Sequence, residues 1–449
     1  MIMEMLKNDM VYFLGIGGIG MSALARYFLK KGYRVAGYDR TSSNITCNLE
    51  KEGAMIHYHE DINVIPDEIA FVVMTAAIPA DSIELLALKQ RGVKIYKRAE
   101  ILGMLSRKCN AICVSGTHGK TTTTSLITHI LHCDRMKISA FIGGIANNFN
   151  SNVVICDADD KVMVVEADEY DHSFLQLSPY ISIVTSIDAD HLDIYYDNQH
   201  LIDSFNEFVN KTAVDGVVIC RTNLPVVTER KMIVYGFENA DIKADSIRIV
   251  DGMTEFHVTR CALDLGVFRI PLFGEHNILN ALASMTAAME MGVGADVIRE
   301  ALCSFKGVWR RFDIRVNKND TVYIDDYAHH PEEIKATLKT VCTVFPDRMM
   351  TVVFQPHLFS RTRDFLDGFA ESLSIADRVI LLDIYPAREK PIQGITSSVL
   401  LDRICCAEKM LCHKSELLNV LKKIHPELIV TMGAGDIDRL VPEIEEMLK

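Results

Sequence analysis

Short apolar runs alternate with amphipathic stretches from the beginning of the chain. Residues 11–14 and 35–38 are apolar enough to form strands, and residues 21–31 between them carry Leu24, Phe28 and Leu29 on one side of a helix. Further strands are predicted where the alternation continues, at 71–74 and 93–96. Strands that alternate with helices are typical of a parallel, doubly wound sheet. We therefore predict an α/β domain over residues 1–108, of the Rossmann-like type.

A second unit starts after a brief rise in polarity near residues 107–110. Its strands are predicted at 111–114, 162–165 and 181–185, with a helix over about 121–132. From 232 to 272 short stretches alternate apolar and polar residues, which predicts an antiparallel region attached to the α/β core. An alanine-rich helix follows over 274–291. We assign residues 109–311 to a central domain of the P-loop mononucleotide-binding type.

The third unit repeats the alternation. Its strands are predicted at 322–324, 351–354, 379–382 and 428–431. We assign residues 312–449 to a second Rossmann-like domain. The predicted fold is therefore α/β in three domains, with boundaries after residues 108 and 311.

A glycine-rich turn follows the first predicted strand and opens the first helix. It contains Gly15, Gly17, Gly18, Ile19 and Gly20. Asp39 stands about 20 residues further on, as in the dinucleotide-binding fingerprint. Such a turn points backbone N–H groups and a helix dipole at an anion. Read alone it predicts NAD binding, but the same geometry serves any pyrophosphate, including that of a nucleotide sugar, and a purely structural turn is a third possibility.

A second glycine loop, residues 115–122, follows the first strand of the central domain. It is a shortened P-loop, because Val114 stands where the full pattern has its first glycine. Lys120 suits the charge of the β- and γ-phosphates, and the Thr121 hydroxyl suits Mg²⁺. Only this loop carries a lysine and a hydroxyl for a triphosphate and its metal. The sequence thus predicts two phosphorylated ligands with different roles.

Acidic and imidazole side chains follow two strands of the same domain. Glu166 ends the strand at 162–165, and His191 comes soon after the strand at 181–185. The carboxyl ends of parallel strands are where α/β sheets place ligand-binding groups. Beside a P-loop we favour metal binding at Thr121, Glu166 and His191, although solvated acidic loops are the alternative.

Composition narrows the class of protein. The formal net charge of −13 argues against a nucleic-acid binder, which needs a basic face. The 12 cysteines lack zinc-site spacing and indicate reduced thiols. Neither a signal peptide nor an apolar span long enough for a bilayer is evident, so we expect a cytoplasmic protein without membrane insertion.

A set of motifs in fixed order resembles the Mur ligases of peptidoglycan synthesis. The motifs are Ser115–Thr122, Glu166–Glu169, Asp188–Asp193, Gly274–Asn280, Arg310–Asp313 and Asp325–Pro331. The loop at Gly15–Ser22, together with Phe354–His357 and Ser360–Arg363, is most similar to the member that adds L-alanine. The resemblance spans nearly the whole chain.

The resemblance implies a role for each matching residue. ATP would contact Gly116, Thr117, His118, Gly119, Lys120, Thr121, Thr122, His276, Asn277, Asn280, Arg311 and Asp326. Residues with a catalytic role would be Lys120, Glu166, His191, Arg311, Asp326 and His329. The incoming amino acid would contact His329 and Arg361, and the first loop with Asp39 would hold UDP-N-acetylmuramate. The implied activity is Mg²⁺- and ATP-dependent joining of L-alanine to that sugar's carboxylate through an acyl phosphate.

The chain also departs from the family pattern. Leu358 stands where members often have an arginine that pairs with the amino-acid carboxylate, which leaves selectivity for alanine over glycine or serine open. No lysine is a convincing candidate for carbamylation, and Lys211 is only the nearest one after His191. The identity of the base that deprotonates the amine, the kinetic order and the oligomeric state are not predicted.

Three other functions compete with this one. An NAD-dependent oxidoreductase would leave Lys120, Glu166 and Asp326 unexplained. A ligase that attaches a recycled murein tripeptide to the same sugar is a closer alternative. The residues of the first loop, 15–22, favour the alanine-adding member instead. A non-catalytic relative is disfavoured because Lys120, Thr121, Glu166 and His191 are all present.

Overall fold

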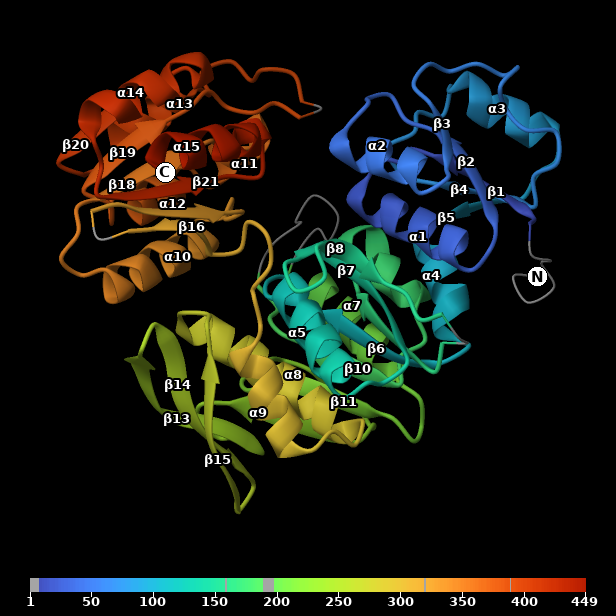
Figure 1. Cartoon of the computed structure of the whole chain (residues 1–449), viewed down its shortest axis with the longest axis horizontal. Helices are drawn as coiled ribbons and strands as arrows, with labels where there is room; N and C mark the ends of the chain where they lie inside the picture. The colour runs from blue at the N-terminus through green and yellow to red at the C-terminus, as the bar shows by residue number, and fades with distance from the viewer. Residues whose placement is uncertain (1–7, 158–159, 189–197, 319, 388) are drawn as a thin grey trace. The chain divides into compact units, whose positions relative to one another are not determined.

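Three sheets, each with helices beside it, make up the computed structural model of the chain (Figure 1). The structure describes residues 8–157, 160–188, 198–318, 320–387 and 389–449. No helix within these ranges has both the length and the apolar character needed to cross a membrane. The predicted α/β class is confirmed.

The first sheet has five strands in the order β3-β2-β1-β4-β5, all parallel. Its strands are β1 Met10–Leu14, β2 Arg34–Tyr38, β3 Met55–His57, β4 Phe71–Met74 and β5 Ile95–Lys97, and its helices are α1 Ile19–Lys30, α2 Asn44–Lys51, α3 Ile83–Gln90 and α4 Arg98–Ser106. The doubly wound pattern is confirmed. The strand expected from residue 93 starts at Ile95, because the Val93 N–H still closes the end of α3 on the Leu88 carbonyl at 3.3 Å.

The second sheet has ten strands, in the order β15-β14-β13-β12-β11-β10-β6-β9-β7-β8. Its first part comprises β6 Asn110–Ser115, α5 Lys120–Cys133, β7 Ile138–Ala146, β8 Ser151–Val154, β9 Val162–Glu166, the 3₁₀ helix η1 Tyr170–Gln176, β10 Ile181–Val184, α7 Asn198–Asn210, β11 Val217–Arg221 and β12 Met232–Gly236. β6 lies parallel between β9 and β10. The carboxyl ends of these three strands therefore meet at one edge, where the second glycine loop begins.

The region from Met232 is only partly antiparallel, which corrects the sequence prediction. β12 pairs parallel to β11, since the segment over residues 222–231 carries the chain back between them. β13 Ile242–Val250, β14 Met253–Arg260 and β15 Leu263–Ile270 are neighbours in the sheet joined by two-residue connections. Connections this short permit only antiparallel pairing. α8 Glu275–Glu290 and α9 Ala295–Cys303 follow.

The third sheet has six strands in the order β16-β17-β21-β18-β19-β20, parallel except for the edge strand β16. Its strands are β16 Asp313–Asn317, β17 Val322–Asp326, β18 Met350–Phe354, β19 Arg378–Leu381, β20 Glu408–Leu411 and β21 Leu428–Met432. The helices are α10 Pro331–Val344, α11 Phe359–Asp364, α12 Leu366–Leu373, α13 Ser397–Arg403, α14 Leu417–Ile424 and α15 Val441–Leu448. The predicted strands of this domain are all present.

The chain packs into two compact units. The first holds the first two sheets and runs to Lys306, apart from Ile249–Thr254 and Leu272–His276, which pack with the second unit, Gly307–Lys449. Within the first unit, α1 joins the two sheets through Asp160, whose carboxylate accepts hydrogen bonds from Tyr27 at 2.7 Å and from Lys31 at 3.0 Å. The two glycine loops therefore lie in one unit.

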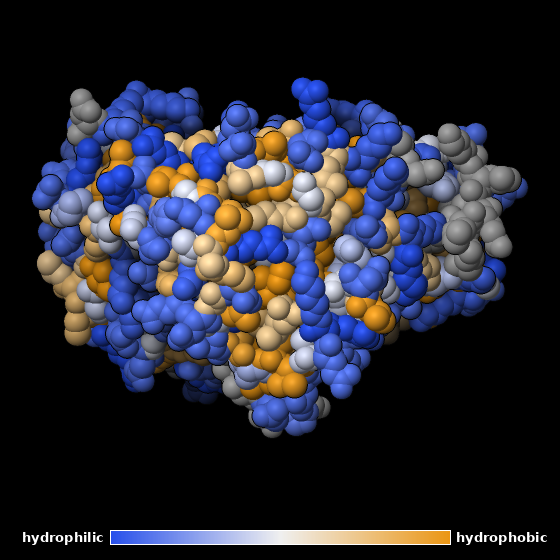
Figure 2. Space-filling view, turned by 90° about the horizontal axis from the view of Figure 1, so that it is seen from below, coloured by the Kyte–Doolittle hydropathy of each residue, from blue (hydrophilic) through white to orange (hydrophobic). Residues whose placement is uncertain are grey.

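Hydrophilic residues cover most of the face drawn in Figure 2, and hydrophobic residues stand in groups between them. Large exposed apolar side chains come from many elements, with Val214, Val227 and Leu263 among the most exposed. Scattered apolar residues are normal on protein surfaces and need no binding partner.

Candidate functional site

The second glycine loop turns sharply at two glycines with left-handed backbone. Gly116, directly after β6, has φ +129°, and Gly119, at the start of α5, has φ +82°. A Cβ atom at Gly116 would overlap the Thr185 hydroxyl and lie 2.8 Å from the Ser186 nitrogen. At Gly119 it would lie 2.5 Å from Oδ1 of Asn280. Only glycine suits both positions, so the loop is built for a tight turn into the helix.

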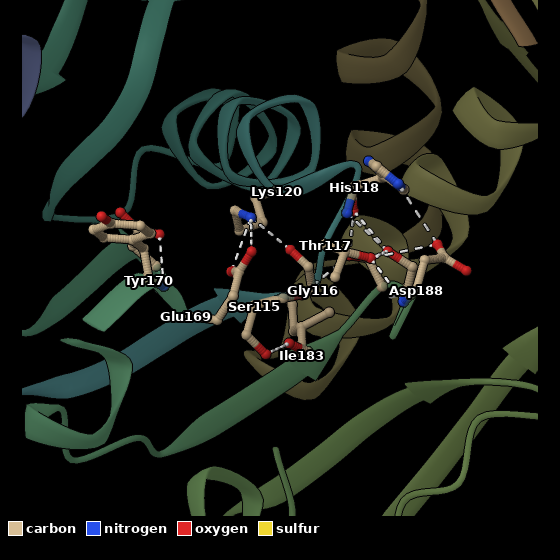
Figure 3. Close-up of polar contacts among 12 residues, drawn as sticks. Ser115, Gly116, Thr117, His118, Lys120, Glu169, Tyr170, Ile183 and Asp188 are labelled. Atoms are coloured by element: carbon tan, nitrogen blue, oxygen red, sulfur yellow. Dashed lines mark hydrogen bonds and ion pairs between the residues drawn. The ribbon is translucent and has the colours of Figure 1, made fainter. Parts of the chain in front are cut away.

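The end of β10 fastens this loop (Figure 3). The Thr117 N–H donates to the Ser186 carbonyl at 3.2 Å, and the His118 N–H donates to Oγ of Ser186 at 2.8 Å. The Asp188 N–H donates to Oγ1 of Thr117 at 3.1 Å. These bonds engage the N–H groups in the middle of the loop. The N–H groups of the first turn of an α-helix have no acceptor within the helix, so the start of α5 is suited to an anion.

The Lys120 side chain of the loop is held by three hydrogen bonds. Its Nζ donates to the Gly116 carbonyl at 2.6 Å and to the two carboxylate oxygens of Glu169 at 2.8 and 2.9 Å (Figure 3). Burial alone would lower the pKa of Lys120, but the carboxylates of Glu169, Asp168 and Glu166 outweigh it and hold the pKa above its ordinary value. Lys120 is therefore positively charged at neutral pH.

Glu169 is a site residue to which sequence reasoning gave no role. It directly precedes η1, and its side chain is fully buried. Burial raises the pKa of this carboxyl group, and Lys120 counteracts the rise. A buried lysine needs an opposite charge nearby. The acidic residues that follow β9 indicate in the sequence that such a partner for Lys120 is present. The sequence does not show which carboxylate of that run turns toward Lys120.

Glu166, by contrast, points into a pocket. Its Oε2 accepts a hydrogen bond from the Gly143 N–H on β7 at 3.0 Å. The pocket has a volume of 330 Å³ and also contains Gly18, Ile19 and Gly20 of the first loop. One hollow within the first unit thus connects the first glycine loop with a predicted metal ligand.

Asp39 fixes the first loop. Its Oδ2 accepts a hydrogen bond from the Gly17 N–H at 2.7 Å, and its Oδ1 accepts one from the Thr41 N–H at 3.1 Å. Gly15 takes the left-handed φ of +83° at the end of β1. The loop therefore has the predicted strand–turn–helix course, with its carboxylate bonded to its own backbone.

Arg98 is a second residue that sequence reasoning missed. It begins α4 and lines the same pocket as Glu166. Its Nη1 is so close to Gly20 that a Cβ there would be 2.5 Å away, and its Nη2 lies 3.7 Å from Oδ2 of Asp168. A lone arginine in the sequence carries no motif, so only the fold shows that this cation stands over the first loop.

The residues between 276 and 280 that are predicted to contact the nucleotide are divided between the two units. Asn280 packs against the second loop, where its Oδ1 accepts a hydrogen bond from Oγ1 of Thr123 at 3.2 Å, and its Nδ2 donates to Asn277 at 3.2 Å. Thr121 and Thr122 are buried in the first turns of α5. His276 packs with the second unit, and it is exposed there.

Asp326 and Arg311 lie in the second unit. Both oxygens of Asp326 accept backbone hydrogen bonds at 2.7 Å, from Ala328 and from Phe312. Burial raises the pKa of Asp326 to about 6, although Arg311 counteracts the rise. The Arg311 guanidinium lies over the Tyr327 ring, 5.0 Å from its centroid. Its neighbour Arg310 is instead buried in an ion pair with Asp325 at 3.0 Å.

Of the two residues predicted for the amino acid, His329 lies between β17 and α10, and Arg361 lies in α11. His329 Nδ1 lies 3.0 Å from the Tyr327 carbonyl and 3.4 Å from a carboxylate oxygen of Glu333. Burial lowers the pKa of His329 to about 4, and the Arg361 charge contributes to the shift. His329 is therefore neutral at physiological pH. Leu358 has a left-handed φ of +67° just before α11.

Of the three predicted metal ligands, His191 lies outside the described residues. Within the described part of the chain, no group of three or more histidine, cysteine or acidic residues could hold a metal ion. Mg²⁺ prefers oxygen ligands and often uses only one or two carboxylates together with waters and substrate phosphates. The Glu166 carboxylate and the Thr121 hydroxyl fit that requirement.

Three family models match successive parts of the chain. They describe a Mur ligase family catalytic domain over residues 10–109, a Mur ligase middle domain over 114–288 and a Mur ligase glutamate ligase domain over 310–435. The UDP-N-acetylmuramate–L-alanine ligase of Cytophaga hutchinsonii is 45% identical over 446 residues, which are 97% of this chain and 96% of that protein.

Solved structures agree with these matches. The UDP-N-acetylmuramate-alanine ligase of Thermotoga maritima superimposes with a TM-score of 0.83 at 28% identity, covering 97% of this chain and 99% of that one. A murein peptide ligase of Psychrobacter arcticus gives a TM-score of 0.73 at 22% identity, covering 98% and 99%, which is a likeness of fold. The predicted three-domain architecture is confirmed.

Proposed function

The chain belongs to the Mur ligase family, and from that premise we propose that it joins L-alanine to the carboxylate of UDP-N-acetylmuramate at the expense of ATP. The observation that carries the proposal is the pocket that connects the first glycine loop with Glu166 in the unit that also holds the Lys120 loop. The reaction brings a diphosphate-linked sugar acid to a triphosphate. Two phosphate-binding loops in one unit supply both.

In this proposal the first loop holds the diphosphate of the sugar nucleotide. Ile19 and Gly20 begin α1 and line the pocket, so their N–H groups are available to the diphosphate, and Arg98 supplies positive charge beside Gly20. Asp39 keeps the loop in shape by occupying the Gly17 N–H. The lactyl carboxylate of the sugar would then reach toward Glu166 through the shared pocket.

The second loop holds ATP. The first turn of α5 and Lys120 bind the phosphates, with Gly116, Thr117, His118, Gly119 and Thr122 shaping the loop and Asn277 and Asn280 beside it. Mg²⁺ bound through Thr121, Glu166 and His191 would neutralise charge that develops on the phosphoryl oxygens. We also assign His276, Arg311 and Asp326 to the nucleotide, as the family resemblance implies.

The chemistry proceeds in two displacements. A carboxylate oxygen of the sugar attacks the γ-phosphorus, the bond to ADP breaks, and an acyl phosphate forms. The alanine amine, which must lose a proton to attack, then adds to the acyl carbon, and the C–O bond breaks to release phosphate. Lys120 stabilises the charge of the first transition state. Positioning of three substrates supplies the remainder of the rate.

His329 and Arg361 are assigned to the amino acid. Because its pKa is about 4, His329 is a poor acceptor for a proton at neutral pH, so we assign it a positioning role through hydrogen bonding. Arg361 is assigned to the carboxylate of alanine, since Leu358 offers no charge. We place the reaction in the cytoplasm, where ATP is available.

A phosphate-release assay tests the proposal. Phosphate should appear only when ATP, UDP-N-acetylmuramate and L-alanine are all present, and a new amide product should form in equal amount. Glycine, serine and a murein tripeptide belong in the same assay, to measure selectivity and to test the closest rival. Phosphate release with the tripeptide but not with alanine would refute the proposal, as would NADH turnover without ATP.

A further inference from the structure

All three hydrogens of the Lys120 ammonium have acceptors within the protein. The Gly116 carbonyl lies at 2.6 Å, and the two oxygens of Glu169 lie at 2.8 and 2.9 Å. An ammonium group has three donors and no more. A phosphate oxygen can therefore bond to Lys120 only by taking the place of one of these acceptors or by sharing a hydrogen with it.

Glu169 is buried beside Lys120. Its side chain has no exposed surface, and that of Lys120 is 15% exposed. A buried carboxylate that loses its partner is strongly destabilised, because water does not reach it. Burial of Glu169 therefore makes separation of the ion pair costly.

The other two carboxylates of the acidic run bond in different directions. Glu166 accepts a hydrogen bond from the Gly143 N–H at 3.0 Å. Asp168 accepts one from the Tyr170 N–H at 3.1 Å and has Arg98 at 3.7 Å. Both carboxylates raise the pKa of Lys120 from a distance, whereas Glu169 is the one bonded directly to its ammonium. Of these three carboxylates, Glu169 is therefore the one that would have to give up a bond to Lys120 when a phosphate binds.

We propose that Glu169 is a positioning residue that competes with the phosphates of ATP for Lys120 and so weakens nucleotide binding. The inference rests on the proposed function of the loop. Before ATP binds, Glu169 and the Gly116 carbonyl hold the Lys120 ammonium. When ATP binds, its phosphates take over part of the bonding of Lys120, and Glu169 takes it back when ADP leaves. Because bonds between Lys120 and Glu169 must break when the phosphates bind, the net affinity for nucleotide is lower. The lower affinity keeps ADP from binding too tightly.

The test is the affinity for the Mg²⁺ complex of a non-hydrolysable ATP analogue, measured by isothermal titration calorimetry. Glu169→Gln keeps the shape of the side chain and removes its charge, so the Kd should fall by about tenfold or more. A residue with a merely structural role would give the opposite sign, because a disturbed loop binds nucleotide less tightly. An unchanged or higher Kd for Glu169→Gln would overturn the proposal.

Two further variants serve as controls for this test. Asp168→Asn removes the same charge from the same acidic run, and its Kd should stay within about twofold of wild type, since the three bonds of Lys120 remain. Glu169→Asp keeps the negative charge but shortens the side chain, so the carboxylate lies farther from the Lys120 ammonium. The Kd of this variant should lie between those of wild type and Glu169→Gln. If Glu169→Gln fails to fold, a Kd for Glu169→Asp equal to or above that of wild type overturns the inference.

Failure of the inference and failure of the proposed function give different results. If wild-type protein releases no phosphate with UDP-N-acetylmuramate and L-alanine, the proposed function is wrong. If wild type turns over and Glu169→Gln does not bind the analogue more tightly, only the competition is wrong. In support, the Glu169→Gln variant should also release ADP more slowly in stopped-flow displacement.

Discussion

The two glycine loops of the first unit share a strand–turn–helix course and are fastened in different ways. The first is held at the end of β2, where Asp39 accepts from the Gly17 N–H and the Tyr38 carbonyl accepts from the N–H groups that begin the loop. The second is held by the end of β10, through Ser186 and Asp188, and by the ion pair of Lys120 with Glu169. The first loop is thus fixed through its backbone N–H groups, whereas the second also carries a charged side chain, Lys120, paired with Glu169.

Under the proposed function, this difference corresponds to what each ligand must do. A sugar nucleotide needs its diphosphate held while chemistry takes place at the distant carboxylate, and backbone N–H groups with one arginine are sufficient for that. ATP needs charge neutralised at the phosphorus that reacts, and a lysine provides it. Glycine loops with the same backbone course can therefore serve binding in one case and catalysis in the other.

The largest effect should come from the lysine of the second loop. Lys120→Ala removes the charge that stabilises the phosphoryl transfer, and phosphate release should fall about 10³-fold or more. The Kd for UDP-N-acetylmuramate should change by no more than about threefold, because the first loop is untouched. Lys211→Ala, at an exposed lysine of the same domain, is the matched control and should retain activity. Comparable losses of catalysis and sugar binding in Lys120→Ala would break the comparison.

The backbone of the loops can be compared by adding one methyl group to each. Gly116→Ala forces a left-handed residue into the space of Thr185, and it should destabilise the protein by about 2–4 kcal/mol in urea unfolding. Gly18→Ala has an ordinary φ and no atom nearer than 3.7 Å, so its stability should stay within about 0.5 kcal/mol of wild type. Equal losses of stability in Gly116→Ala and Gly18→Ala would show that the backbone strain is wrongly assigned to Gly116.

Arg98 tests the charge of the first loop. Arg98→Ala should raise the Kd for UDP-N-acetylmuramate about 30-fold, because it removes the cation beside Gly20. The Kd for a non-hydrolysable ATP analogue should be nearly unchanged, and Arg98→Lys should restore part of the sugar affinity. Weaker binding of the ATP analogue to Arg98→Ala would mean that the two loops are not independent.

The smallest effect is expected at Asp39. Asp39→Asn keeps an oxygen for the Gly17 N–H, so the Kd for the sugar nucleotide should change by no more than about threefold, with a loss of stability of about 1 kcal/mol or less. In an NAD-type site this carboxylate binds the ribose, and its loss would be severe. A decrease in affinity beyond about tenfold in calorimetry would therefore assign Asp39 to the ligand.

The fold was largely predictable because its strands are short apolar runs that end at glycines or acidic residues. The pairing of β12 was not predictable, since alternation of apolar and polar residues describes a strand exposed on one face and says little about the direction of its neighbour. The P-loop residues could be assigned because lysine and threonine follow glycine at a fixed spacing, and the family prediction is confirmed.

The partners of those residues could not be assigned in the same way. Nothing in the acidic run after β9 distinguishes Glu169, which bonds to Lys120, from Glu166, which faces the pocket, because the turn into η1 decides where each side chain points. Arg98 was missed for a similar reason, as it comes from a helix distant in sequence. The roles of all the predicted site residues, from Lys120 and Glu166 to His191, Arg311 and His329, stay predictions.

The central claim is that the two loops hold two different ligands at once, and calorimetry with both ligands tests it most directly. UDP-N-acetylmuramate should bind with one-to-one stoichiometry to the free protein and equally well to protein saturated with a non-hydrolysable ATP analogue and Mg²⁺, whereas NAD⁺ should give no heat and displace neither ligand. Mutual exclusion of the sugar nucleotide and the ATP analogue, or displacement of the sugar nucleotide by NAD⁺, would contradict the account.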